Sequence, residues 1–238
     1  MKLAISNLAF NNFDEIKDLN IPLLECVFSK IQPILCQTNS SINEWKENLS
    51  INIKPYSVQS ITYGCGLINF EASPSNLNVI DKIINLSRTL NLERLIFGSP
   101  TLRKGKPDLS MFKYIDERLF GSNMIFCIEP NSRIYGGEYF FDIDEISIFL
   151  KKHKFKNIYT MVDTHNSWLE QKCPSKDIYK HQDIICHVHA SEIKLNGLTS
   201  LDKHKEFACM LNKINYSQVI TYESNNLNGI NNFTDIYK

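Results

Sequence analysis

The sequence lacks an excess of charge of either sign. Its 238 residues include 26 Lys and Arg and 26 Asp and Glu, so the formal net charge is zero. Proteins that bind nucleic acids carry a basic surface that matches the phosphate backbone. The charge balance therefore gives no support to a nucleic-acid partner.

The cysteines lack the spacing of a metal ribbon or of a redox motif. No CxxC pair occurs, which excludes a zinc ribbon and a thioredoxin-type motif. Their number is odd and several lie in apolar runs, as expected for reduced core residues of an intracellular protein. The seven are Cys26, Cys36, Cys65, Cys127, Cys173, Cys186 and Cys209.

Long apolar stretches are missing as well. No run is long enough to span a bilayer, and the first residues, MKLAIS, do not form a charged segment followed by a long apolar core. We therefore expect no signal peptide and no membrane partner, and a cytoplasmic location.

Short apolar runs, in contrast, recur along the whole chain. Each has about the length of a strand and is mostly apolar, as in strands that are buried on both faces. The eight runs are KLAIS (2–6), PLLECVF (22–28), SVQSITYG (57–64), RLIFG (94–98), MIFCIE (124–129), IYTMVD (158–163), IICHVH (184–189) and QVITYE (218–223).

Amphipathic segments separate most of these runs. Residues 75–91, for example, place Leu77, Ile80 and Ile84 on one helical face, with Ser75 as a candidate cap. Strands that alternate with helices are typical of a parallel sheet with the helices outside. Further helices are expected at 108–120, 142–153 and 200–214, with a short one at 13–19.

Eight strand–helix units in a chain of this length predict an α/β fold, a single (β/α)8 TIM barrel that spans residues 1–238. Only residues 224–238 follow the last expected strand. A full closing helix barely fits there, so we expect an abbreviated C-terminal helix.

Four of the runs end in a residue type that binds metal ions. Glu129, Asp163, His189 and Glu223 end the fifth, sixth, seventh and eighth runs. In a TIM barrel these strand ends meet at the face that carries the active site. A single acid there is often only solvated, but four candidates on consecutive strands favour a divalent-metal site. Three carboxylates and an imidazole suit Mn²⁺, Mg²⁺, Co²⁺ or Fe²⁺, with positions left open for water or substrate.

These motifs resemble the xylose isomerase-like TIM barrel superfamily, in its sugar phosphate isomerase/epimerase branch. The resemblance covers nearly the whole chain. It is carried by IFGSP (96–100), IEPNSR (128–133), VDTHN (162–166), HVHASE (187–192) and YES (222–224). The branch includes tagatose and psicose 3-epimerases, hydroxypyruvate isomerase, inosose dehydratase and the apurinic endonuclease of the endonuclease IV type.

The resemblance implies a metal site and a reaction. The epimerases hold one divalent ion with a glutamate, an aspartate, a histidine and a glutamate that match Glu129, Asp163, His189 and Glu223. Their two glutamates exchange a proton next to a carbonyl, through a metal-stabilised enediolate. We therefore expect Glu129 and Glu223 as catalytic residues, and Mn, Mg, Co, Fe or Zn as the cofactor.

The chain departs from the family pattern at the corner after the sixth strand. Family members usually carry a histidine three residues after the aspartate, where it reaches a substrate oxygen. Here that position is Asn166, and His165 comes one residue earlier; both are candidate substrate contacts. The seventh-strand arginine of the epimerases is not matched, and the nearest basic residue is Lys194.

Three more residues are candidates for substrate contact. Glu25 is expected at the barrel mouth, where it either touches substrate or is only partly solvated. His187 shares a strand face with His189, so we expect it in the substrate pocket or behind the metal ligands. Arg103 lies in the basic loop SPTLRKGKP (99–107), which either meets a phosphate or is solvated surface. The solvated reading of this loop is favoured.

The leading functional prediction is a metal-dependent sugar isomerase or epimerase with a small-molecule carbohydrate substrate, phosphorylated or not, in a homodimer or tetramer. A dehydratase begins with the same proton abstraction, so the ligand set does not separate the two. A non-catalytic barrel is compatible with the changed corner and the short tail. A nuclease is disfavoured, because the endonuclease takes histidines from the third and fourth strands, whereas TYGCG and FGSP contain none.

Overall fold

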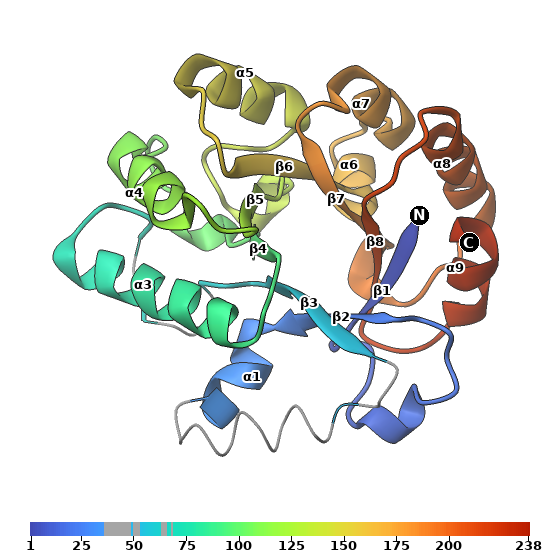
Figure 1. The fold of residues 1–238 in the computed structure, drawn as a ribbon. Helices are drawn as coiled ribbons and strands as arrows, with labels where there is room; N and C mark the ends of the chain where they lie inside the picture. The colour runs from blue at the N-terminus through green and yellow to red at the C-terminus, as the bar shows by residue number, and fades with distance from the viewer. Residues whose placement is uncertain (36–48, 50–52, 63–65, 68) are drawn as a thin grey trace.

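The computed structural model describes residues 1–35, 49, 53–62, 66–67 and 69–238 (Figure 1). Trp45, expected from the sequence to pack within a helix, lies outside the described residues, as do Cys36, Cys65 and the last two residues of the run 57–64. Among the helices in the described part of the chain, none has the length and apolar content to cross a membrane.

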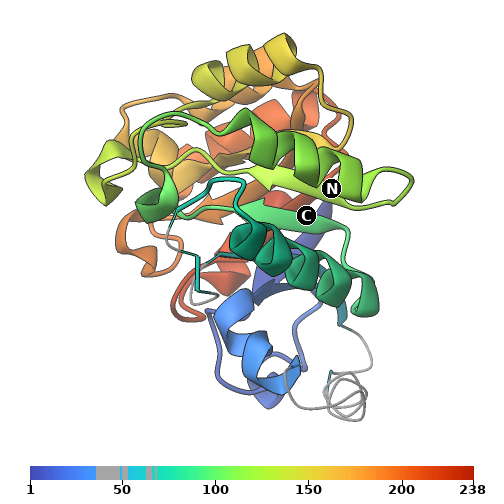
Figure 2. The same cartoon turned by 90° about the vertical axis from the view of Figure 1, so that its left-hand side faces the viewer.

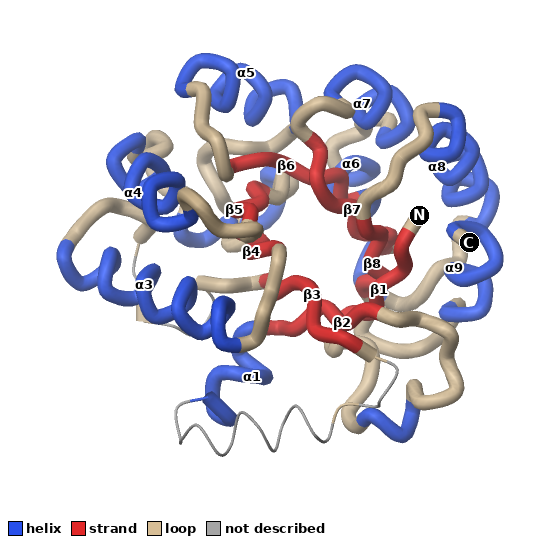
Figure 3. The backbone as a smooth tube through the Cα atoms, in the orientation of Figure 1, coloured by secondary structure: helices blue, strands red, loops and turns tan. Residues whose placement is uncertain are grey.

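Eight parallel strands close into a barrel in chain order, from β1 beside β2 round to β8 beside β1. Figure 3 shows the strands as an inner ring with the helices outside it. The predicted single (β/α)8 TIM barrel is therefore confirmed. The strands are β1 (Lys2–Ser6), β2 (Leu23–Val27), β3 (Lys54–Gln59), β4 (Arg94–Phe97), β5 (Ile125–Ile128), β6 (Ile158–Asp163), β7 (Ile185–Ser191) and β8 (Val219–Glu223).

The third strand begins and ends earlier than its apolar run predicts. Lys54 pairs with Leu23 of β2 although it is charged, and the strand ends at Gln59. Ser60 has a φ of 52°, which turns the chain out of the extended conformation before the run is complete. Backbone geometry, which hydrophobic periodicity does not report, thus decides this boundary.

Helices cover the outside of the barrel, and Figure 2 shows α3 and α4 lying along it. The C-terminal helix has eight residues, as the short tail predicts. The helices are α1 (Phe28–Leu35), α3 (Pro74–Thr89), α4 (Leu109–Leu119), α5 (Ile143–His153), α6 (Thr164–Leu169), α7 (Pro174–His181), α8 (Leu201–Lys213) and α9 (Ile230–Tyr237).

Side-chain caps begin four of the described helices, one of which is α6, where Asp163 accepts the N–H of Asn166. Ser73 accepts the backbone N–H of Asn76 ahead of Pro74, so the cap of α3 is Ser73 and not Ser75 as expected. Asp108 accepts the N–H of Ser110 at the start of α4. Asp142 caps α5 in the same way.

The expected helix at 13–19 is wrong. Only a single 3-10 turn forms there, η1 (Phe13–Glu15). The carboxylate of Glu15 accepts the backbone N–H groups of Asn11 and Asn12, both at 3.1 Å, which closes the turn on itself. Ile16 then packs into the core instead of continuing a helix.

The barrel interior has an apolar and a polar part. Ile96, Cys127, Met161 and Cys186 form a buried apolar cluster. Elsewhere in the interior lies a hydrogen-bonded group of fully buried polar side chains from β2, β3, β7 and β8, namely Glu25, Ser57, His187 and Thr221. Polar groups that are buried away from water are stable only when they hydrogen-bond to one another, and the contacts within this group meet that condition.

Candidate metal centre

Four side chains from consecutive strand ends converge at the carboxyl face of the barrel. His189 Nδ1 lies 3.2 Å from Glu223 Oε2, 3.6 Å from Asp163 Oδ2 and 4.0 Å from Glu129 Oε1. One ligand atom from each of the four lies within 4.8 Å of every other, and all four residues are buried. The parallel register explains this, because Asp163 pairs with His189 and β8 places Glu223 beside Ser191.

The chemistry of this cluster fits a divalent cation. His189 Nδ1 is buried and has no hydrogen-bond partner among the described residues. It points instead at three carboxylates whose like charges repel one another at this separation. A cation at about 2.0–2.4 Å from each donor would satisfy the nitrogen and offset the repulsion. The donor set of three oxygens and one nitrogen belongs to the hard and borderline divalent metals.

The electrostatics of the cluster show the same shortage of positive charge. Burial, reinforced by the neighbouring carboxylates, raises the pKa of Glu129 well above its usual value and raises that of Glu223. Burial alone would raise the pKa of Asp163, but the neighbouring His189 and a hydrogen bond from the Asn166 N–H lower it overall. Although burial opposes it, the surrounding carboxylates raise the pKa of His189 well above its usual range. A divalent ion bound here would supply the positive charge that an extra proton on His189 supplies in its absence.

Glu25 lies beneath the cluster and holds the two strand-seven histidines. Its two carboxylate oxygens lie 2.9 Å from His189 Nε2 and 3.0 Å from His187 Nε2, and Ser57 donates to it at 2.8 Å. The prediction that Glu25 contacts substrate at the barrel mouth is wrong, because its side chain is fully buried behind His189. His187, also fully buried, donates to Glu25 rather than facing the mouth.

Glu25, His187 and His189 form a second group with ligand atoms close together. The 2.9 and 3.0 Å separations, however, are those of direct contacts between donor and acceptor and leave no room for an ion between them. This group is therefore the support of the first cluster. A carboxylate behind a histidine fixes the ring and leaves the other nitrogen free to bind metal.

Residues that follow β4 surround Glu129. A Cβ on Gly98 would come within 1.8 Å of Glu129 Oε2, so only glycine leaves room for this carboxylate. Arg103 donates to the backbone carbonyls of Phe97 and Glu129, at 2.6 and 2.8 Å, and to that of Phe140. Its guanidinium thus ties the ends of β4 and β5 together.

The expectations for Arg103 are therefore wrong. Its side chain is 0% exposed, so it is neither solvated surface nor placed to meet a substrate phosphate. The physical reason is that three buried carbonyls lie close together there, and a guanidinium supplies several donors in a fixed geometry; the carbonyls of Phe97 and Phe140 also accept a backbone N–H. Lys104, next along the loop, remains exposed and contacts Gly136 O and Glu138.

The corner after β6 lines the mouth beside the cluster. Asn166 Nδ2 donates to Glu129 Oε1 at 3.4 Å, and its Oδ1 accepts the N–H of Ser132. His165 Nδ1 contacts Glu192 O at 2.7 Å, and Nε2 contacts the hydroxyl of Tyr135 at 2.7 Å. Both His165 and Asn166 line the cavity, as required for substrate contact. Lys194 is exposed in η4 (Ile193–Leu195) and does not line it.

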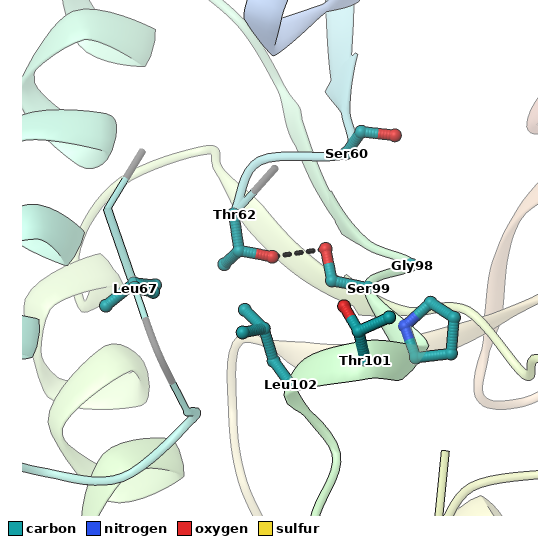
Figure 4. A pocket seen from close by; sticks show the side chains of 8 residues that line it. Ser60, Thr62, Leu67, Gly98, Ser99, Thr101 and Leu102 are labelled. Atoms are coloured by element: carbon teal, nitrogen blue, oxygen red, sulfur yellow. Dashed lines mark hydrogen bonds between the residues drawn. The ribbon is translucent and has the colours of Figure 1, made fainter. Parts of the chain in front are cut away.

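The cavity above the cluster has a volume of about 220 Å³. A second pocket of about 400 Å³ adjoins it at Gly98 and Pro100, between the ends of β3 and β4 (Figure 4). The first is lined by Gly98, Pro100, Glu129, Asn131, Tyr135, Asp163, His165, Asn166, Leu195 and Glu223.

Sequence reasoning missed Tyr135 and Gly98 as site residues. Tyr135 lies in η3 (Arg133–Tyr135), a short turn after β5 that has no periodic pattern to reveal it. Gly98 lies within IFGSP, directly after a buried strand, and a glycine at that position indicates that another group can approach closely.

The fold and the cluster together define a TIM barrel with a candidate divalent-metal centre at the carboxyl ends of its strands. No family model and no curated protein matches the sequence. Solved structures do match it. D-psicose 3-epimerase from Clostridium cellulolyticum H10, solved with D-tagatose, is 17% identical over 100% of this chain and 90% of that one, with a TM-score of 0.73.

Two further matches have other activities. AP endonuclease, family 2, from Brucella melitensis is 14% identical over 96% of this chain and 95% of that one, with a TM-score of 0.73. 3-Keto-D-glucoside 4-epimerase from E. coli is 14% identical over 95% and 92%, with a TM-score of 0.69. The structural neighbours are xylose isomerase-like TIM barrel proteins, which confirms the resemblance at the level of the fold. Because that fold supports several chemistries, the function must be argued from the site.

Proposed function

We propose that this protein is a divalent-metal-dependent isomerase or epimerase that acts on a sugar, a sugar phosphate or a related keto-polyol. The observation that carries the proposal is the position of Glu129 and Glu223. These carboxylates come from β5 and β8, which are not neighbours in the barrel, and they line one cavity beside the same candidate ligands. A ketose held between them would meet one carboxylate on each face.

Each carboxylate has a defined part in this proposal. One removes the proton from the carbon next to the carbonyl, and the other returns a proton to the opposite face or to the neighbouring carbon. Burial raises the pKa of both glutamates in the metal-free cluster, so each carboxylate there holds a proton more readily than an exposed one. A divalent ion, when bound, would stabilise the charge of the enediolate and keep its ligand carboxylates ionised.

Asn166, His165 and Tyr135 would orient the substrate. Asn166 donates to Glu129, which holds that carboxylate in place beside the cavity. His165 and Tyr135 contact each other at the cavity wall. Correct orientation of a bound substrate toward its base supplies a large part of the rate enhancement in such reactions.

The match to the fold of an AP endonuclease suggests nuclease activity as an alternative. The metal-ligand residues of this chain and its charge argue against that activity. In the described residues, the second group with metal-ligand character, Glu25, His187 and His189, is held by direct contacts of 2.9 and 3.0 Å that leave no room for a further ion. The ends of β3 and β4, at Gln59 and Phe97, carry no histidine. The formal net charge is zero, without the excess of positive charge that attracts a polyanion.

Solvent deuterium exchange tests the proposal. The Mn²⁺-loaded protein is incubated in D₂O with D-psicose, D-tagatose and D-fructose and with their 1- and 6-phosphates, and label next to the carbonyl is followed by NMR. We expect exchange with at least one ketose, and a loss of about 10²–10⁴-fold in Glu129→Gln and Glu223→Gln. Glu117→Gln makes the same change on exposed α4 and should leave the rate unaltered.

Two results would contradict the proposal. The first is wild-type protein with bound Mn²⁺ that exchanges no label into any of the ketoses. The second is a Glu223→Gln variant that keeps its metal and exchanges at the wild-type rate. Exchange that is followed by loss of water from the substrate would instead identify a dehydratase.

A further inference from the structure

A chain of contacts with a fixed direction ends at the cavity wall. His165 Nδ1 lies 2.7 Å from the backbone carbonyl oxygen of Glu192. A carbonyl oxygen only accepts, so Nδ1 carries the proton, and in the neutral imidazole Nε2 is then an acceptor. With the imidazole neutral, the Tyr135 hydroxyl, 2.7 Å from Nε2, donates its hydrogen to His165. The tautomer follows here from the hydrogen-bond partners.

This direction determines what Tyr135 offers to a ligand. With its hydrogen committed to His165, the phenolic oxygen retains only acceptor lone pairs. Tyr135 lines the 220 Å³ cavity together with Glu129, Asp163 and Glu223. The phenolic oxygen of Tyr135 can therefore pair there with a group that donates a hydrogen bond, such as a hydroxyl. A phosphate or carboxylate oxygen, which only accepts, would meet lone pairs or would have to break the contact between Tyr135 and His165.

The described walls of the two pockets lack positively charged lysine and arginine side chains. Among the described residues that line the two adjoining pockets, none is a lysine or an arginine. Arg103 is committed to backbone carbonyls and Lys104 to Gly136 O and Glu138. Arg133 pairs with Glu170 outside the cavity. Three carboxylates exceed the charge of one divalent ion, so the site would remain negative and would repel a phosphate dianion.

The described residues that line the adjoining 400 Å³ pocket carry no charge, and four of them carry hydroxyl groups. Figure 4 shows Ser60, Thr62, Ser99 and Thr101 around it, with Leu67 and Leu102 on its apolar side. Hydroxyl groups both donate and accept, and they suit the hydroxyls of a sugar. The pocket leaves space for a substrate that extends beyond the 220 Å³ cavity.

We propose that Tyr135 accepts a hydrogen bond from a substrate hydroxyl and that the site selects an uncharged polyhydroxylated ketose over its phosphate esters. The inference rests on the proposed function and narrows its substrate class. Tyr135 is then a specificity-determining residue, and His165 positions it.

Steady-state kinetics with matched substrates test this inference. For the Mn²⁺-loaded wild type, kcat/KM for each free ketose that reacts should exceed that for its 1- and 6-phosphates by at least about 100-fold. Tyr135→Phe should raise KM for the free ketose about 10-fold and leave the Kd for Mn²⁺ unchanged, because the variant loses one hydrogen bond to substrate. Tyr179→Phe, on exposed α7, is the matched control and should behave like the wild type.

The possible outcomes distinguish a failure of this inference from a failure of the proposed isomerase function. A ketose phosphate that is turned over better than its free ketose overturns the inference and leaves the isomerase proposal standing. A preferred free ketose with unchanged KM in Tyr135→Phe overturns the role of Tyr135. Absence of turnover with every ketose and every phosphate overturns both the inference and the proposed function.

Discussion

Replacement of Glu25 by Gln tests the support beneath the candidate metal ligands. Glu25 is fully buried and lies 2.9 Å from His189 Nε2 and 3.0 Å from His187 Nε2. A carboxylate only accepts, so it favours the His189 tautomer with the proton on Nε2 and the lone pair on Nδ1, which faces the three carboxylates. A glutamine retains the shape but offers one acceptor and one donor to two imidazoles.

The magnitude follows from this loss. Either His187 or His189 must face the amide NH₂. His187 Nε2 also contacts the Thr221 hydroxyl at 3.0 Å, so the lost acceptor matters most for the Nε2 hydrogen of His189. A lost hydrogen bond to a charged group in a buried site costs about 1.5–3 kcal/mol. When His189 takes the other tautomer instead, its Nδ1 carries a proton where the ion should bind. We therefore expect Glu25→Gln to weaken Mn²⁺ binding by about 10- to 100-fold.

Isothermal titration with Mn²⁺ measures this effect, with the thermal unfolding midpoint of the metal-free protein as a second readout. Glu117→Gln carries the same change of charge on the surface of α4 and should bind Mn²⁺ like the wild type. Equal Mn²⁺ affinity of Glu25→Gln and wild type would refute the positioning role of Glu25. Weaker binding in Glu117→Gln as well would show that net charge, and not His189, is the cause.

Three further predictions concern other supports of the site. Gly98→Ala should lower Mn²⁺ affinity at least 10-fold with little change in unfolding temperature, because the new Cβ displaces the flexible Glu129 carboxylate, 1.8 Å away, but no backbone; wild-type affinity would contradict this. Arg103→Met should lower the free energy of unfolding by roughly 3 kcal/mol in urea titrations, since three hydrogen bonds from the guanidinium to buried carbonyls are lost, although the carbonyls of Phe97 and Phe140 keep a backbone N–H donor; a change below about 1 kcal/mol would show that the contacts are dispensable. Burial raises the pKa of the Glu192 carboxyl, but side-chain and backbone hydrogen bonds lower it to about 2 from 4.5, so it stabilises the folded state above pH 4.5, and this stabilisation is lost as the pH falls towards 2. Glu192→Gln should accordingly cost about 1–2 kcal/mol at pH 7 and progressively less below pH 4.5, and a cost that does not depend on pH would contradict the assignment.

The strands and the four candidate ligands were predictable from the sequence for one physical reason. Strands that are buried on both faces consist mostly of apolar residues, so they appear in the sequence as apolar runs. Four such runs end in a candidate ligand, namely Glu129, Asp163, His189 and Glu223. Parallel strands bring these ends to one face of the barrel, so knowledge of the fold nearly determines the cluster.

The supports of the site were harder to predict, because they depend on depth and direction. Arg103 looks like a surface cation in a Gly- and Pro-containing loop, yet the fold buries it on three backbone carbonyls. Glu25 was placed at the correct strand but at the wrong depth, since periodicity gives the face of a strand and not the layer within the barrel. Tyr135 enters the site through a single 3-10 turn that leaves no pattern in the sequence.

The claim on which the account rests most directly is that one divalent ion binds between four strand ends. Crystals soaked in MnCl₂ and measured at the manganese absorption edge test it. The account predicts one strong anomalous peak per chain, at about 2.0–2.4 Å from carboxylate oxygens of Glu129, Asp163 and Glu223 and from Nδ1 of His189. A peak between Glu25, His187 and His189 instead, or no peak at either place at millimolar Mn²⁺, would contradict it.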